Sequence, residues 1–141
     1  MDKRDLQKGC TKTMKEQIVR TDAQNERYTD EGCFILELSN TAEDEAVSIA
    51  RARVKPGVTT KLHRLRGIAE RYLILKGNGR VAVGGLPPED LVLGDVVLIP
   101  PDCPQRITNT GTEDLLFLAV CTPRFTPDSY EEVEGASKTG E

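Results

Sequence analysis

Short apolar or alternating segments follow one another from Cys33 to Cys121, and turn-forming residues separate them. No stretch carries a helical period, and short segments at this interval are typical of an all-β sandwich or barrel. We therefore predict strands within residues 33–38, 47–54, 59–65, 71–76, 80–83, 91–93, 96–99, 106–108 and 115–121. Between two of them, Gly77-Asn78-Gly79 supplies the positive φ angles that a tight hairpin needs.

Two of the predicted strands are apolar on both faces, at residues 72–75 and 115–120. An antiparallel strand with one face in water alternates apolar and polar residues, so something must cover the outer faces of these two. The second sheet, the terminal segments and another subunit are the candidates. We favour another subunit and expect a homodimer.

Length and charge limit the organisation and the partners of the chain. Its 141 residues fit one domain, which we place at 18–125, between a flexible N-terminal arm (1–17) and an acidic tail (126–141). The net charge of −4 lacks the basic footprint that nucleic-acid binding requires. No apolar run approaches the roughly 20 residues of a membrane span, and the charged start has no secretory apolar region. We expect a cytoplasmic protein with free thiols and neither nucleic-acid nor membrane partners.

One histidine, His63, is the sole imidazole in the chain, and a carboxylate follows it at Glu70. In a strand, alternate residues share a face, so Lys61, His63 and Leu65 lie opposite Arg64 and Arg66. Because arginine avoids an apolar interior, the face that carries His63 is predicted to turn inward.

The next predicted strands add two polar groups with the same inward direction. Glu70 shares its face with Tyr72 and Ile74, and Gln105 shares its face with Ile107. An imidazole, a carboxylate and a carboxamide among apolar side chains describe a small-molecule pocket. Two simpler interpretations stay open: Glu70 could pair with a neighbouring cationic side chain, and Gln105 could hydrogen-bond to backbone groups.

The spacing of these residues resembles the cupin superfamily, whose motifs are G-x5-H-x-H-x(3,4)-E-x6-G and G-x5-P-x-G-x2-H-x3-N. The matching positions are Gly57, His63, Glu70 and Gly77 in the first motif, and Gly94, Pro100 and Asn109 in the second. The resemblance covers about residues 33–122 and implies a double-stranded β-helix, a small jelly-roll barrel.

Three motif positions differ from the family pattern. Leu65 replaces the second histidine, Asp102 replaces the motif-two glycine, and Gln105 replaces the motif-two histidine. In the family, the histidines and the glutamate hold a divalent metal. The resemblance therefore implies a weakened metal site made of His63, Glu70 and Gln105, with Zn²⁺, Fe²⁺ and Mn²⁺ all admissible.

The resemblance implies a metal-binding small cupin that acts on or binds a small polar molecule, such as a sugar, a sugar phosphate or a small carboxylate. Tyr72 and Lys61 are expected to contact that ligand. An isomerase and a dioxygenase are both open, because the fold does not choose the reaction. Residues 62–83 and 99–111 also resemble the cupin part of bifunctional mannose-6-phosphate isomerases. The alternative is a non-catalytic ligand-binding cupin with a diverged or empty metal site.

Overall fold

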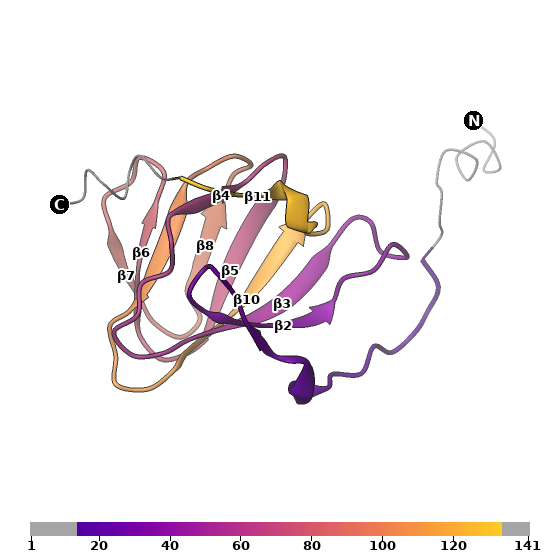
Figure 1. The fold of residues 1–141 in the computed structure, drawn as a ribbon, viewed down its shortest axis with the longest axis horizontal. Helices are drawn as coiled ribbons and strands as arrows, with labels where there is room; N and C mark the ends of the chain where they lie inside the picture. Colours follow the sequence, from indigo (N-terminus) through magenta and orange to yellow (C-terminus); the bar gives the residue numbers. More distant parts are fainter. Residues whose placement is uncertain (1–13, 134–141) are drawn as a thin grey trace.

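The computed structural model describes residues 14–133, which form two antiparallel sheets that face each other as a flattened barrel (Figure 1). The six-stranded sheet has the order β1-β2-β3-β10-β5-β8. Its strands are β1 (Arg27–Tyr28), β2 (Phe34–Ser39), β3 (Ser48–Val54), β5 (Ala69–Lys76), β8 (Val96–Ile99) and β10 (Leu115–Thr122). The five-stranded sheet has the order β11-β4-β9-β6-β7. Its strands are β4 (His63–Leu65), β6 (Gly79–Val83), β7 (Glu89–Leu91), β9 (Gln105–Asn109) and β11 (Tyr130–Glu132).

The predicted all-β, double-stranded β-helix class is confirmed, and each predicted strand region overlaps a strand, although the one predicted at 91–93 shares only Leu91 with β7. The alternating pattern works because one side chain in two turns into the space between the sheets. The core there includes Phe117, Ile74, Ile107 and Leu115, each fully buried. Phe117 packs against Tyr72 with 4.4 Å between ring centroids.

The hairpin predicted at Gly77-Asn78-Gly79 is wrong. This segment links β5 in one sheet to β6 in the other, and the two strands do not pair with each other. The glycine is needed for another reason: Gly77 has a φ of +87°, and a Cβ there would lie 2.8 Å from the backbone oxygen of Asp114. A close crossing between the sheets therefore excludes a side chain at this position.

Two motif positions support the fold through their backbone conformation and hydrogen bonds. Asp102, where the family pattern has glycine, keeps a left-handed φ of +66°, and its carboxylate accepts the Gly67 N–H at 3.1 Å. Asn109 is buried and donates to the carbonyl oxygens of Val54 and Glu113, both at 2.8 Å. Asn109 therefore ties β9 to the end of β3 and to the β9–β10 loop.

The C-terminal segment contributes to the barrel beyond residue 125, the boundary expected from the sequence. Strand β11 pairs with β4, and Phe125 and Tyr130 pack against the buried Leu65, Ile68 and Cys121. Two of the three residues of β11 are glutamates, so the strand itself offers little apolar surface. The packing of Phe125 and Tyr130 holds this segment against the barrel. Most of the expected N-terminal arm, residues 1–13, lies outside the described residues. No helix in residues 14–133 is long and apolar enough to cross a membrane.

Candidate functional site

The three side chains that the sequence predicts as metal ligands lie next to one another between the sheets. His63 on β4 and Gln105 on β9 are direct partners across two neighbouring strands. Gln105 Nε2 donates to Glu70 Oε1 on β5, in the opposite sheet, at 2.6 Å. Their exposed fractions are 2% for His63, 8% for Glu70 and 0% for Gln105. The inward direction predicted for the face that carries His63 and Leu65 is confirmed by this burial.

The hydrogen bond of His63 fixes which ring nitrogen carries a proton. Nδ1 lies 2.7 Å from the carbonyl oxygen of Lys61. A carbonyl only accepts hydrogen bonds, so Nδ1 carries a proton, and when the ring is neutral its lone pair lies on Nε2. The ring also stacks on Tyr130, with centroids 5.0 Å apart and planes at 21°. These two contacts fix the direction in which Nε2 points.

Nε2 points at a residue that the sequence analysis did not single out. Glu31, in the turn between β1 and β2, places Oε2 3.6 Å from His63 Nε2, and its side chain is 19% exposed. Burial raises the pKa of the Glu31 carboxyl, and the nearby His63 acts in the opposite direction. No periodic pattern marks Glu31, and only long-range folding brings its turn to β4.

Glu70 is a buried carboxyl with few polar partners. Burial, helped by the charge of Glu31, raises the pKa of Glu70 to about 7, although the hydrogen bond from Gln105 acts against this rise. The Cys121 thiol lies 3.8 Å from its second oxygen. The amide oxygen of Gln105 is buried and has no hydrogen-bond partner. An unpaired buried acceptor beside a carboxyl is costly unless a proton or a cation is supplied.

Tyr72 and Lys61, the residues expected to contact a ligand, do not line the cavity at this site. Strand β4 begins at His63, so Lys61 lies before it, and its side chain is exposed. The contribution of Lys61 is made by its backbone, which accepts from His63 and donates to the Glu31 carbonyl oxygen at 2.9 Å. Tyr72 does face inward, as expected, but it is 2% exposed and packed in the core against Phe117.

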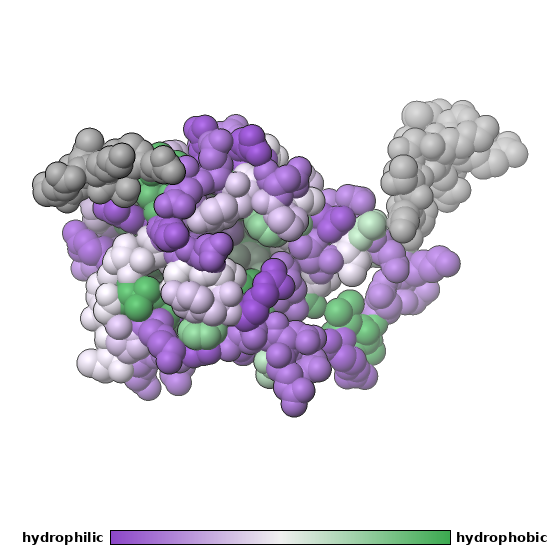
Figure 2. All heavy atoms as spheres, in the orientation of Figure 1, coloured by the Kyte–Doolittle hydropathy of each residue, from purple (hydrophilic) through white to green (hydrophobic). Residues whose placement is uncertain are grey.

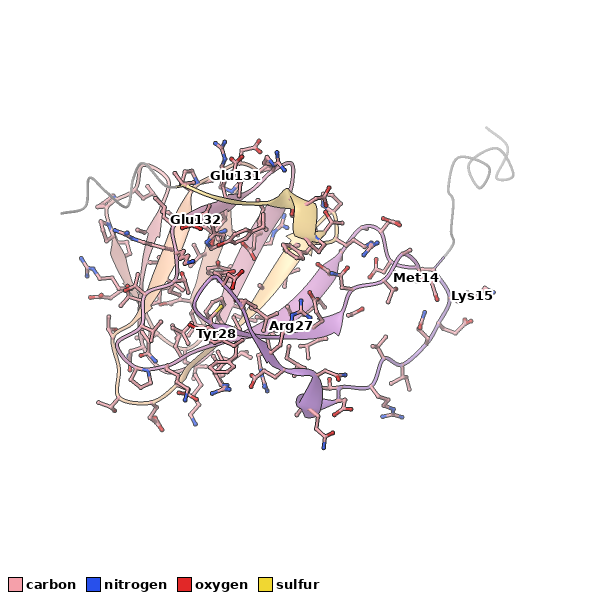
Figure 3. The ribbon with its side chains drawn as sticks, viewed as in Figure 1. Met14, Lys15, Arg27, Tyr28, Glu131 and Glu132 are labelled. Atoms are coloured by element: carbon pink, nitrogen blue, oxygen red, sulfur yellow. The ribbon has the colours of Figure 1, made fainter. Side chains whose placement is uncertain are left out.

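A cavity of about 290 Å³ opens beside the polar cluster. Its apolar wall comes from both sheets and from the C-terminal segment, with Ile35, Ala50, Leu65, Ala119, Phe125 and Pro127. Its charged lining is mostly acidic: Asp30, Glu31, Glu37 and Glu70, against Arg27 and His63. Figure 2 shows this face of the molecule hollowed near its centre, with hydrophobic atoms inside. In Figure 3, Arg27 of β1 and Glu131 of β11 lie on opposite sides of the barrel interior.

The cysteines within residues 14–133 are free thiols, as expected. Cys33 and Cys121 are buried, and burial raises the pKa of each thiol. Cys103 is partly buried against the core, and burial also raises its pKa. Raised pKa values favour the neutral thiol, which is the unreactive form. Cys10 lies outside the described residues.

Comparison with known proteins agrees with the fold and the motif spacing. A sequence model of the cupin domain matches residues 50–121. An uncharacterised protein of Methanocaldococcus jannaschii is 34% identical over 108 residues, which are 75% of this chain and 83% of that protein.

Solved structures of other proteins are similar to this fold. A predicted oxalate decarboxylase from Thermotoga maritima is 27% identical with a TM-score of 0.67, over 76% of this chain and 99% of the other. A double-stranded β-helix protein from Klebsiella pneumoniae has a TM-score of 0.68 at 16% identity, over 84% and 99%. The family match, the relative and the shared fold show that this chain belongs to the cupin superfamily.

Proposed function

We propose that this cupin binds a divalent cation through His63, Glu70 and Gln105, and that the adjoining cavity binds a small polar molecule. The observation that carries the proposal is a set of potential metal ligands with few or no polar partners in one buried place. The amide oxygen of Gln105 has no partner at all, the neutral His63 ring has a lone pair on Nε2, and the buried Glu70 carboxyl has only Gln105 and the Cys121 thiol beside it. A cation would offset the cost of keeping such groups away from water.

The residues fit a cation in the type of their donor atoms. One imidazole nitrogen with several oxygens suits Zn²⁺, Fe²⁺ or Mn²⁺. Within residues 14–133, no three His, Cys, Asp or Glu side chains stand in a metal-binding arrangement. The donors instead form two linked pairs, His63 with Glu31 and Glu70 with Gln105. A bound cation would act as a Lewis acid on a ligand oxygen.

The protein's own contribution is to orient the donors and to shape the ligand space. The hydrogen bond to Lys61 and the stacking of Tyr130 hold the imidazole in one tautomer and one direction. The cavity volume lies near the lower end of small-molecule sites, about 300–1,000 Å³. Its mostly acidic lining disfavours a phosphorylated ligand, so among the ligands considered a neutral sugar or polyol fits best.

Two observations favour a second candidate, a ligand-binding cupin that holds no metal. Leu65 is buried in the cavity wall at the position of a family histidine, and no three His, Cys, Asp or Glu side chains within residues 14–133 are arranged as a metal site. In that case a proton on Glu70 would replace the cation, and the cavity would bind its ligand by shape and hydrogen bonds.

Metal content separates the two candidates. We expect untagged protein to hold close to one equivalent of Zn²⁺, Fe²⁺ or Mn²⁺ by elemental analysis, and His63→Ala and Gln105→Ala to weaken binding tenfold or more. Glu132→Gln is the matched control, because Glu132 pairs with His63 across the strands but its side chain is exposed. Metal retained in full by His63→Ala would contradict the assignment. Absence of metal in the wild type, after incubation with each ion, would favour the second candidate.

We also propose that the outer face of the six-stranded sheet is a homodimer interface. Leu118, Leu73 and Val96 form an apolar row across β10, β5 and β8. β8 is an edge strand, and Leu98 on it is 71% exposed. An exposed apolar edge with free backbone groups is a site for pairing with another strand, here β8 of a second copy.

Light scattering after size-exclusion chromatography tests the dimer. We expect twice the chain mass of 15.5 kDa for the wild type, and 15.5 kDa for Leu98→Arg. Leu86→Arg is the control, because Leu86 is similarly exposed but lies between β6 and β7 in the other sheet. A wild-type mass of 15.5 kDa would refute the dimer.

A further inference from the structure

The candidate cation site lacks one donor that its position in the barrel calls for. Leu65 lies on the same face of β4 as His63, is 4% exposed and lines the cavity beside it. A leucine offers no lone pair, so this side of the site is apolar. His63 Nε2 therefore faces a space in which the strand itself provides no second ligand.

Glu31, from another part of the chain, lines the same cavity as Leu65 and reaches His63 Nε2. Its turn is held by three backbone hydrogen bonds: Thr29 N–H to Cys33 O, Gly32 N–H to Thr29 O, and Lys61 N–H to Glu31 O. Gly32 has a φ of +102°, which permits the sharp reversal. The Glu31 backbone is therefore tied to the residue that also accepts the hydrogen bond from His63 Nδ1.

This double use of Lys61 fixes the two functional side chains relative to each other. Oε2 of Glu31 and Nε2 of His63 lie 3.6 Å apart, which is too far for a direct hydrogen bond. A carboxylate oxygen and an imidazole lone pair repel each other unless a proton or a metal cation lies between them. A second observation favours the metal cation: the buried amide oxygen of Gln105, the strand partner of His63, has no hydrogen-bond donor.

We propose, building on the cation site above, that Glu31 is a protein ligand of the cation and takes the place of the donor lost at Leu65. The cation would then have four candidate protein ligands, His63, Glu31, Glu70 and Gln105, and its binding would draw together the two pairs in which these side chains stand. The β1–β2 hairpin thus becomes part of the site. Glu31 in its turn compensates for the leucine that stands at position 65 of β4 in place of a histidine.

Binding of Mn²⁺ and Zn²⁺ measured by titration calorimetry tests this assignment. We expect Glu31→Gln to weaken binding tenfold or more relative to the wild type, because a ligand charge is lost. Asp30→Asn, a change of the adjacent carboxylate that also lines the cavity, is the control and should leave affinity within about twofold. Leu65→His added to Glu31→Gln should recover most of the lost affinity, since it returns a donor to the apolar side.

The outcomes keep the two proposals apart. A wild type that binds either ion, with Glu31→Gln of equal affinity, would overturn the role of Glu31 and leave the cation site in place. If Asp30→Asn weakened cation binding as much as Glu31→Gln, the loss would reflect the general surface charge. That result would also overturn the role of Glu31 as a ligand. A wild type that binds neither ion would remove the cation site and this inference together. Circular dichroism of each variant confirms that the fold is retained.

Discussion

Replacing Glu70 by glutamine removes a buried charge, and the structure predicts opposite effects on the metal-free and the cation-bound protein. Burial raises the pKa of this carboxyl to about 7 from an ordinary value of 4.5. A raised pKa in the folded state means that folding favours the protonated form. The stabilising contribution is fully present below about pH 4.5 and is lost as the pH rises through 7.

The size of the effect follows from the two pKa values. Their difference, 7 − 4.5, is about 2.5, and each pKa unit corresponds to about 1.4 kcal/mol. Ionised Glu70 therefore costs the metal-free fold up to about 3.5 kcal/mol above pH 7. A glutamine keeps the shape of the protonated acid and can still hydrogen-bond to Gln105. We expect Glu70→Gln to be about 2–3 kcal/mol more stable than the wild type at pH 8, and nearly equal to it at pH 4.5.

Urea unfolding in the presence of a chelator, from pH 4.5 to 8.5, measures this difference, with Glu132→Gln as the exposed control. Added Mn²⁺ at 100 times its dissociation constant should then stabilise the wild type by about 2.7 kcal/mol and the variant by much less. An equal gain in stability at pH 4.5 and pH 8, or no gain at either, would refute the desolvation argument.

Three further predictions concern the framework around the site. Gly77→Ala should cost about 1–3 kcal/mol, because Gly77 has a positive φ and a Cβ would meet backbone, whereas Gly85→Ala, with open space, should leave the melting temperature unchanged. Phe117→Ala removes a fully buried ring and should cost about 3–5 kcal/mol in chemical unfolding. Glu26→Gln should cost about 1–2 kcal/mol at pH 7. Hydrogen bonds from Arg53 lower the pKa of Glu26, so this difference should fade as the pH falls below 4.5, and a constant difference would contradict it.

The sequence predicts much of the site because strands have a simple geometry. Since alternate residues of a strand share a face, His63 and Leu65 could be placed on the inner side of β4, and Glu70 on the inner side of β5. The same rule fails for Lys61 because β4 begins at His63. Lys61 precedes the strand, where side chains no longer alternate between two faces. It also misjudges Tyr72, whose inward direction is right but whose ring is used for core packing against Phe117.

Local sequence thus determined the strand-rich class, the turns and the inward set of polar residues, since backbone propensity and a period of two act over a few neighbours. Only the tertiary structure decided which strands pair across the two sheets, so that Gly77 crosses between sheets instead of turning a hairpin. It also brought Tyr130 onto the face of the His63 imidazole and Glu31, far away in the sequence, to its Nε2 edge. Such contacts depend on closure of the whole barrel, and no local pattern encodes them.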